Sequence, residues 1–271
     1  MKFAAVLGSP IKHSLSPTIH GAAYRKLGFD AVYEACDVDS QGLQAFLSSK
    51  LAQSDWIGFS LTMPLKEKIC EIAQDLGISL DDQSIRITSA NTLYRDGDSW
   101  KGTSTDVLGF SFLLKNLNIR EATIIGAGGT ARAAIEALGE ECAIKIVRRD
   151  DKRDDTIRRA FPDREISFSP WVDLDKAWSR TLVVVAVPTQ ATPDVVKTFK
   201  PPEILIDALY SPWLPPVSEL QVQSGGKLFS GIDLLCAQAL GQIRLMTSES
   251  FDENEIFSYL KSVALEVVTN R

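Results

Sequence analysis

The sequence predicts an α/β protein of two domains. Short apolar runs alternate with amphipathic stretches along its 271 residues, and this alternation is typical of parallel sheets covered by helices. Residues 182–187 form a continuous, valine-rich apolar run, as expected for a central strand buried on both faces. A second apolar run, 122–125, leads directly into a glycine-rich segment and then a helical pattern. The two α/β series meet near Asp106, where we place the domain boundary.

In the first series, helices are expected where apolar residues recur every three or four positions, and strands where they run together. Asp96-Gly97 is typical of a two-residue hairpin turn. Pro64 suits the start of a helix, where its missing N–H costs nothing. The expected strands are 3–7, 31–36, 56–61, 90–94 and 100–103, and the expected helices are 17–27, 43–48 and one that follows Pro64.

The second series repeats the alternation of strand and helix, which favours a doubly wound domain. A last amphipathic segment closes the chain. The expected strands are 122–125, 144–147, 182–187 and 204–208, and the expected helices are 106–117, 130–138, 154–161 and 255–268.

Charge and composition exclude several classes of protein. The formal net charge of −6 provides no basic surface for nucleic acid. No apolar stretch reaches the roughly 20 residues of a membrane span, and the first apolar run ends at Gly8, too early for a signal peptide. The four cysteines form no C-x-x-C pair, and no cluster of metal ligands is evident, which favours free thiols in a reducing compartment. We expect a cytoplasmic protein that binds neither nucleic acid, membrane nor metal.

Residues 121–133 read EATIIGAGGTARA and contain the G-x-G-x-x-G/A pattern between a strand and a helix. Gly126 permits the tight turn, Gly128 lets the backbone approach a pyrophosphate, and Ala131 lets the helix pack on the strand. The N–H groups at the helix start attract phosphates. An ordinary tight turn is the alternative. The pattern predicts a dinucleotide site formed by Gly126, Ala127, Gly128, Gly129, Thr130 and Ala131.

The strand that follows ends in a basic cluster of Arg148, Arg149, Lys152 and Arg153. NAD enzymes usually place an acidic residue there, about 20 residues beyond the loop, for the ribose hydroxyls. Guanidinium groups instead suit the 2′-phosphate of NADP. NADP is therefore favoured over NAD, with a solvated charged loop as the alternative. Asp150 would repel a phosphate unless its side chain turns away.

The first half carries polar residues at similar junctions of strand and helix. Ser14 and Ser16 lie in GSPIKHSLSP, 8–17, where their hydroxyls can contact a polyhydroxylated or carboxylated ligand. Ser16, directly before Pro17, is equally well placed as a helix N-cap. The other polar candidates are Thr62 and Lys66, which flank a proline before a helix, and Asn91 and Asp106.

Together these segments resemble the shikimate dehydrogenase family. That family carries G-x-P-x-x-H-S-x-S-P, N-V-T-x-P-x-K, A-x-N-T, G-x-N-T-D-x-x-G, G-A-G-G-x-x-R-A and a late G-hydrophobic-x-M-L-x-x-Q-A signature. The matching segments occur in family order, over about 230 residues, so the set is far more specific than any single motif. They are 8–17, 60–66, 89–93, 102–109, 126–133 and 231–239.

The resemblance implies an N-terminal α/β substrate domain, 1–105 with 240–271, and a Rossmann-type doubly wound NADP-binding domain, 106–239. It implies the reversible reduction of 3-dehydroshikimate to shikimate in aromatic amino acid (chorismate) biosynthesis, by a monomer or a homodimer. Lys66 and Asp106 would be the catalytic pair. Substrate would be bound by Ser14, Ser16, Thr62, Lys66, Asn91, Asp106, Tyr210 and Gln238, and the cofactor, beyond the loop and Arg148, by Arg149, Arg153, Asp82, Ala208 and Gly231.

The chain departs from the family pattern at four places. Ser60 and Ser104 replace asparagines, and Asp150 stands where a threonine is usual. Ser211-Pro212 follows Tyr210, but Pro215-Pro216 interrupts the usual T-x-L continuation. None removes a residue assigned to chemistry, although Ser104 can alter the hydrogen bonding that fixes Asp106. Of the two histidines, His13 is expected to orient the substrate loop and His20 to be structural.

Two alternatives stay open on the same framework. An NAD-linked quinate/shikimate dehydrogenase typically has an acidic residue after the second Rossmann strand and a threonine in the substrate loop, so Arg149 and Ser14 argue against it. A non-catalytic ligand sensor would have lost the lysine–aspartate pair, which this chain retains as Lys66 and Asp106.

Overall fold

The computed structural model describes residues 1–270 and divides them into two units, one of which is discontinuous in sequence. The first unit combines Met1–Gly109 with the chain from Leu235 onward, and the second is Phe110–Leu234. Both divisions fall inside helices, α5 (Thr105–Leu114) and α10 (Gly231–Thr247). The predicted boundaries, 105/106 and 239/240, put Asp106 and Gln238 in the second domain. The structure puts both in the first unit, where each accepts a hydrogen bond from Asn91.

The first unit is built on a mixed six-stranded sheet of order β2-β1-β3-β5-β6-β4. The pairs β1–β2, β1–β3 and β4–β6 are parallel, and β3–β5 and β5–β6 are antiparallel. The turn at Gly97, where φ is +61°, joins β5 to β6 as predicted. The strands are β1 (Lys2–Gly8), β2 (Ala31–Asp37), β3 (Trp56–Leu61), β4 (Ile78–Leu80), β5 (Thr92–Asp96) and β6 (Ser99–Thr103).

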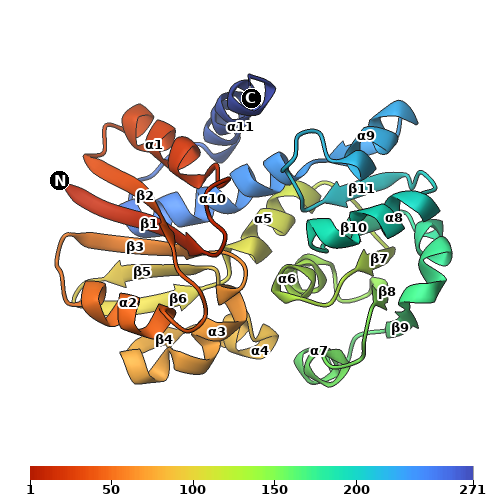
Figure 1. The fold of residues 1–271 in the computed structure, drawn as a ribbon, viewed down its shortest axis with the longest axis horizontal. Helices are drawn as coiled ribbons and strands as arrows, with labels where there is room; N and C mark the ends of the chain where they lie inside the picture. The colour runs from red at the N-terminus through yellow and green to blue at the C-terminus, as the bar shows by residue number, and fades with distance from the viewer. Residues whose placement is uncertain (271) are drawn as a thin grey trace. The chain divides into compact units, whose positions relative to one another are not determined.

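Helices cover both faces of this sheet, with α1 and α10 on one side and α2 and α3 on the other (Figure 1). A hydrophobic core lies on each face of the sheet, and residues of β1 contribute to both. Ala4 packs with Tyr24 and Met246 on one face, and Leu7 packs with Leu65 on the other. The helices of this unit besides α5 and α10 are α1 (Ser16–Leu27), α2 (Leu43–Leu51), α3 (Leu65–Ile72), α4 (Asp82–Ile87) and α11 (Glu253–Thr269), with a 3₁₀ turn η1 (Gln74–Leu76).

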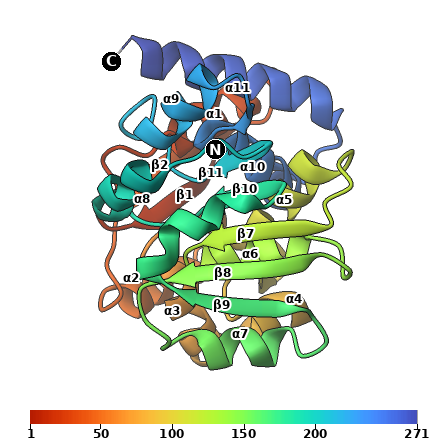
Figure 2. The same cartoon turned by 90° about the vertical axis from the view of Figure 1, so that its right-hand side faces the viewer.

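The second unit has a fully parallel sheet of order β9-β8-β7-β10-β11-β12, and Figure 2 shows β9 to β11 in this sequence. Counted from β7, this is the order 3-2-1-4-5-6 of the Rossmann fold. The direction of winding reverses between β7 and β10, where such folds bind their ligands. The strands are β7 (Glu121–Ile125), β8 (Ala143–Arg148), β9 (Ile166–Pro170), β10 (Leu182–Val185), β11 (Ile204–Asp207) and β12 (Lys227–Phe229).

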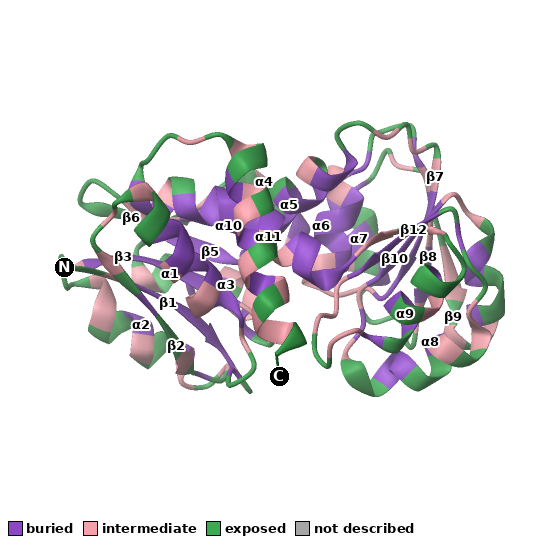
Figure 3. Ribbon diagram, turned by 90° about the horizontal axis from the view of Figure 1, so that it is seen from above, coloured by how far each residue is buried: buried purple, intermediate pink, exposed green. Residues whose placement is uncertain are grey.

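Helices on both faces bury the central strands of this sheet. Every residue of β10 and β11 is buried, and Figure 3 shows the inner strands as buried and the outer helix surfaces as exposed. The valine-rich run predicted as a central strand is therefore β10. The helices are α6 (Gly129–Ala137), α7 (Asp154–Ala160), α8 (Thr192–Thr198) and α9 (Pro216–Gln223), with 3₁₀ segments η2 (Trp171–Ser179) and η3 (Thr189–Ala191).

Every expected strand and helix is present, with ends that shift by a few residues. The predicted cap at Ser16 is wrong: α1 begins at Ser16, its N-cap is Leu15, and the Ser14 hydroxyl accepts the Ser16 backbone N–H at 3.2 Å. The elements not predicted are β4, β9, β12, α4, α8, α9, α10 and the 3₁₀ segments. Within residues 1–270, no helix is both long and apolar enough to cross a membrane.

Asp207 ends β11 with a carboxyl group that is only 1% exposed. Its Oδ1 accepts the Leu209 N–H at 3.1 Å, and its Oδ2 accepts the Ser218 hydroxyl at 2.9 Å. The side chain therefore ties the loop after β11 to α9. Burial raises the pKa of Asp207 to about 6, and the two hydrogen bonds oppose this rise.

Replacing Asp207 with Asn should change how stability depends on pH. The pKa is about 6 in the folded state against an ordinary value of 3.8 for an aspartate, so the folded state binds the proton more tightly. The contribution of Asp207 to stability is therefore full below pH 4 and is lost as the pH rises through 6. A pKa difference of about 2, at about 1.4 kcal/mol each, gives at most ~3 kcal/mol.

Urea unfolding of both proteins between pH 4 and pH 7 measures this effect. The advantage of wild type over Asp207→Asn should shrink as the pH rises. The exposed Asp163→Asn serves as the control and should show little such trend. A difference for Asp207→Asn that stays constant with pH would contradict the assignment.

Candidate active site

The glycine-rich loop leaves β7 at Gly126 in a conformation that only glycine adopts readily. Its φ is +121°, and a Cβ there would strike the carbonyl oxygen of Ala186, which follows β10. The Gly126 N–H donates to the Val147 carbonyl oxygen at 2.9 Å. The loop is therefore fixed between the ends of β8 and β10, at the reversal of winding in the sheet.

Helix α6 begins directly after this loop, with Gly128 as its N-cap and no acidic residue in its first turn. A Cβ on Gly128 would meet nothing within 4 Å, so space is open where a ligand would approach the backbone. The guanidinium of Arg132, which is 1% exposed, donates to the Ala127 carbonyl oxygen at 3.1 Å and braces the loop from α6. Free N–H groups, open space and a braced backbone fit the pyrophosphate of a dinucleotide.

The basic cluster after β8 divides into two kinds of arginine. Arg148 forms a bidentate pair with Asp154, at 2.9 and 2.7 Å, and the hydrogen bonds to that carboxylate raise the pKa of Arg148. Arg149 and Arg153 are exposed. Asp150 turns back on its own loop, where its Oδ1 accepts the Lys152 N–H at 3.2 Å. Exposed guanidinium groups suit a 2′-phosphate, whereas Arg148 is bonded to the start of α7.

In the first unit, Lys66 and Asp106 form a close ion pair. Lys66 Nζ lies 2.5 Å from Asp106 Oδ2, and the two side chains are 18% and 6% exposed. Lys66 lies in the first turn of α3 and Asp106 in the first turn of α5. The pair keeps a charged donor at the edge of a buried carboxylate, an arrangement suited to proton transfer or to stabilising an oxyanion.

Asn91 joins this pair to Gln238. The Asn91 amide nitrogen donates to Asp106 Oδ1 at 2.9 Å and to Gln238 Oε1 at 3.1 Å. Its amide oxygen accepts the Thr105 backbone N–H at 2.7 Å. Four of the predicted site residues therefore meet in one hydrogen-bonded group, although they come from α3, the start of β5, α5 and α10.

Gly109 lets α5 and α10 approach closely at this group. A Cβ on Gly109 would lie 2.9 Å from the backbone nitrogen of Gln238 and 3.0 Å from its Cβ. Such distances are too short for a side chain, so glycine is required if Gln238 is to reach Asn91. The close approach of the two helices therefore explains why the G-x-N-T-D-x-x-G pattern, matched by residues 102–109, ends in a glycine.

The other predicted substrate residues of the first unit lie at neighbouring loop ends. Ser14 and Thr62 are partly exposed, and Ser16 is 4% exposed. The Thr62 backbone N–H donates to the Leu7 carbonyl oxygen at 2.9 Å, which fixes the end of β3 against β1. Asp82 is exposed at the start of α4 in this unit.

The remaining predicted residues belong to the second unit. Ala208 and Tyr210 follow β11 in the loop tied by Asp207. Gly231 opens α10, where a Cβ would strike the Leu209 carbonyl oxygen. The loop after β11 and the start of α10 are therefore packed against each other.

Both asparagine-to-serine departures are buried. Ser60 Oγ accepts the Tyr33 hydroxyl at 2.6 Å. Ser104 is 1% exposed, and its hydroxyl has no partner among residues 1–270. Asp106 bonds to Lys66 and Asn91 instead, so Ser104 does not supply the hydrogen bonds that fix it.

Several buried polar residues, four near this group and one on α6 behind the glycine-rich loop, were not predicted to take part in a site. Only the position of Arg132 within the loop motif could have signalled its role, since the others lie in segments with no motif of their own. They are Thr92, Thr105, Gln242, His20 and Arg132.

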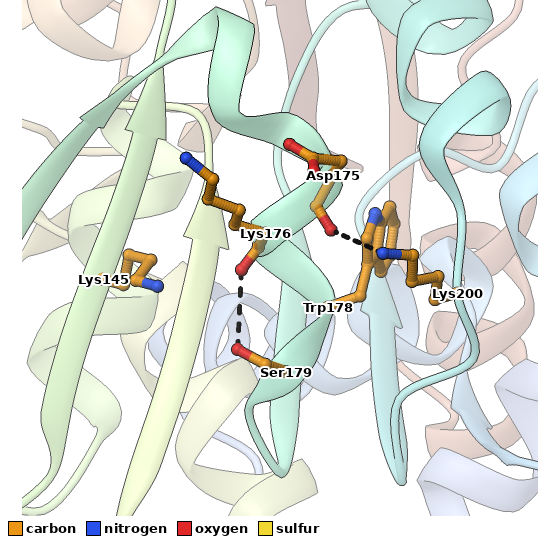
Figure 4. A pocket seen from close by; sticks show the side chains of 6 residues that line it. All are labelled: Lys145, Asp175, Lys176, Trp178, Ser179 and Lys200. Carbon is orange, nitrogen blue, oxygen red and sulfur yellow. Dashed lines mark hydrogen bonds between the residues drawn. The ribbon is translucent and has the colours of Figure 1, made fainter.

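A separate hollow of about 380 Å³ lies on the second unit (Figure 4). Ser179 and Lys200 of its wall precede β10 and β11, so it lies toward the amino ends of these strands, whereas the glycine-rich loop follows the carboxyl end of β7. Lys200 donates to the Asp175 carbonyl oxygen at 3.3 Å. We assign no site here. The lining residues are Lys145, Asp175, Lys176, Trp178, Ser179 and Lys200.

A Rossmann unit with a dinucleotide-type loop and a second unit with a lysine–carboxylate pair together define the class of nicotinamide-dependent oxidoreductases. Known proteins agree with this class. A family model described as the shikimate dehydrogenase substrate binding domain matches residues 6–93. The shikimate dehydrogenase (NADP(+)) of Syntrophobacter fumaroxidans is 32% identical to this chain, and the match covers 98% of this chain and 94% of that protein.

Solved structures show the same similarity. The Mycobacterium tuberculosis shikimate dehydrogenase superposes with a TM-score of 0.83 at 28% identity, covering 97% of this chain and 99% of that one. The Thermus thermophilus shikimate 5-dehydrogenase, crystallised with NADP(H) and shikimate, gives 0.80 at 28% identity, covering 97% and 100%. The chain belongs to the shikimate dehydrogenase family. The predicted family, two-part α/β fold and oxidoreductase class are confirmed.

Replacing Gly109 with Ala should destabilise the first unit. The added methyl group would press on the Gln238 backbone, and such overpacking costs ~1–3 kcal/mol, which outweighs the ~1 kcal/mol that alanine contributes within a helix. Urea unfolding measures the change. Gly139→Ala is the matched control, because a Cβ there meets nothing within 4 Å. Equal stability of the two variants would refute the close approach.

Proposed function

We propose that this chain is an NADP-dependent shikimate dehydrogenase that reversibly reduces 3-dehydroshikimate to shikimate, a step of aromatic amino acid biosynthesis. The observation that carries the proposal is the ion pair of Lys66 Nζ and Asp106 Oδ2, at 2.5 Å, bonded through Asn91 to Gln238. A family member that has retained this group keeps a proton donor beside polar groups that suit a hydroxylated acid.

Substrate binding is assigned to the polar residues of the first unit and to Tyr210. The hydroxyls of Ser14, Ser16 and Thr62 would meet the hydroxyl and carboxylate groups of shikimate. Asn91 and Gln238 would hold the ring hydroxyls near the catalytic pair. This assignment rests on the family motifs and on the clustering of Asn91, Gln238, Lys66 and Asp106.

The cofactor is assigned to the second unit. The loop from Gly126 to Ala131 would hold the pyrophosphate, and Arg149 and Arg153 would hold the 2′-phosphate, with Arg148 supporting their loop through Asp154. Ala208 and Gly231 would border the nicotinamide, and Asp82 would approach the cofactor from the first unit. Bound NADPH would supply the hydride for reduction.

Lys66 and Asp106 provide the proton chemistry in this scheme. As the carbonyl oxygen at C3 becomes a hydroxyl, Lys66 Nζ donates a proton to it and so stabilises the developing negative charge. Asp106 keeps Lys66 in place through Oδ2, while Asn91 fixes Oδ1. Lys66 then regains a proton from water. In shikimate oxidation the same nitrogen accepts the hydroxyl proton.

We also propose a cytoplasmic location. Its support is the family's biosynthetic role and the fact that Cys36, Cys70, Cys142 and Cys236 are not joined in disulfides. Burial raises the pKa of Cys142, which disfavours its reactive thiolate form.

Purified protein should reduce NADP when shikimate is added, with slower rates for NAD and for quinate. Absorbance at the NADPH band measures the rate. Preference for NAD with quinate would replace the proposal by the related quinate/shikimate activity. Absence of turnover with all four combinations, despite shikimate binding, would indicate a ligand sensor.

Lys66→Ala should lower kcat by about 10²–10⁴, the range lost with a general acid–base group. Shikimate affinity, measured by calorimetry, should change much less. Lys68→Ala is the matched control on the same helix, because Lys68 pairs with Glu71 at the surface. An unchanged kcat in Lys66→Ala would remove Lys66 from the mechanism.

Arg149→Ala should raise the KM for NADP about tenfold or more while it leaves the KM for NAD nearly unchanged, since only NADP carries the 2′-phosphate. Steady-state kinetics with each cofactor give both constants. Arg159→Ala, which removes another exposed arginine on α7, controls for net charge. Equal effects on NADP and NAD would contradict the phosphate assignment.

A further inference from the structure

A chain of buried polar side chains runs through the first unit from α1 to the Lys66–Asp106 pair. It links residues that are far apart in sequence but all lie in this unit. Asn91, where it meets the ion pair, was predicted as a site residue. The four residues that lead to Asn91 were not. These members are His20, Gln242, Thr92 and Thr105, and each is at most 1% exposed.

At the outer end of this hydrogen-bonded series, the direction of each hydrogen bond is fixed. The Gln242 amide nitrogen donates to Thr92 Oγ1 at 3.2 Å, so the Gln242 amide oxygen faces His20 Nε2, 3.0 Å away, and accepts a hydrogen bond from its N–H. Burial lowers the pKa of His20 to about 3, so the ring stays neutral. The His20 ring stacks on Tyr33 at 4.0 Å between centroids, and the Tyr33 hydroxyl donates to Ser60 Oγ.

The inner end converges on one atom. Asn91 Oδ1 lies 3.0 Å from Thr92 Oγ1, 3.0 Å from Thr105 Oγ1 and 2.7 Å from the Thr105 backbone nitrogen. The two threonine hydroxyls are 2.8 Å apart. The Thr105 backbone N–H can only donate, so it fixes the Asn91 oxygen on this side, and a flipped amide would place its own N–H groups against that donor.

That orientation decides what the other end of the amide does. With its oxygen held by the threonines, Asn91 must point its nitrogen at Asp106 Oδ1 and Gln238 Oε1. Asp106 Oδ2 then remains for Lys66. A buried polar chain costs free energy unless every link is satisfied, and apolar side chains would have filled the same space at a lower cost.

We propose that His20, Gln242 and Thr92 are positioning residues for the reaction, which orient Asn91 and through it present Asp106 and Gln238 to the substrate. The inference rests on the proposed function, since it names shikimate as that substrate. It assigns a role to His20 beyond the structural one expected for it. None of the three residues touches substrate in this scheme, and all act through Asn91.

Thr92→Val tests the proposal, because it removes the hydroxyl at nearly constant shape. We expect kcat/KM for shikimate to fall about tenfold, the effect of losing about one buried hydrogen bond, while the KM for NADP is unchanged. Thr92→Ser keeps the hydroxyl and should restore kcat/KM to within about threefold of wild type, as expected for a hydrogen-bonding role.

Gln242→Met breaks the chain one link further out and gives an independent test if Thr92→Val does not fold. The double variant should be no worse than the poorer single variant, because both changes interrupt one chain. Effects on kcat/KM that multiply would show two unrelated structural defects and would overturn the proposal.

Tyr24→Phe is the matched control. Its hydroxyl is also buried on α1 and has no partner among residues 1–270, and its ring lies 6.0 Å from that of His20. Its kcat/KM for shikimate should stay at the wild-type value. An equal loss in Tyr24→Phe and Thr92→Val, or an unchanged Thr92→Val, would overturn the positioning role.

Shikimate binding by calorimetry separates this inference from the proposed function. A wild-type protein that binds shikimate without turnover refutes only the reaction, and weaker binding in Thr92→Val but not in Thr92→Ser would still support positioning. A wild-type protein that neither binds nor oxidises shikimate refutes both.

Discussion

A carboxylate withdrawn from water must find a donor for each oxygen, and much of the first unit satisfies this need at Asp106. Its side chain is only 6% exposed. Lys66 serves one oxygen from α3, and Asn91 serves the other from the start of β5. Removing one partner of such a pair leaves a buried charge, which costs several kcal/mol. The three elements therefore cannot shift independently, and Gly109 adds α10 to the same constraint by admitting Gln238.

The second unit depends on a different constraint, the reversal of winding in its sheet. The loop after β7 must turn in the narrow space between β8 and β10, and only a glycine at Gly126 fits against the Ala186 carbonyl group. The loop thus takes its shape from backbone atoms of the sheet and from Arg132, not from side chains that can change rotamer. A dinucleotide would meet N–H groups that are already aligned, so little ordering would oppose its binding.

Most of both sheets could be predicted, because apolar runs and helical periods are local properties of a sequence. Helix α10 could not, since apolar residues occur around most of its circumference and leave little periodic contrast. The pairing of Arg148 with Asp154 depends on where α7 begins, so the sequence alone indicated an arginine facing phosphate. Lys66, Asp106 and Asn91 were found through motifs. Gln242 bonds to a residue 222 positions away, and no local pattern reveals such a contact.

The discontinuity of the first unit bears on how the protein is made. Its sheet is complete by Thr103, yet α10 and α11, which cover that sheet, are translated only after the whole second unit. A growing chain therefore carries the exposed face of the first sheet while the Rossmann unit is synthesised and folds. Gln238 and Gln242 arrive at the end, so a ribosome must finish nearly the entire polypeptide before Asn91 can bond to Gln238 and Thr92 to Gln242. Partial chains would hold the glycine-rich loop without the finished hydrogen-bonded group at Asn91 and with one face of the first sheet uncovered.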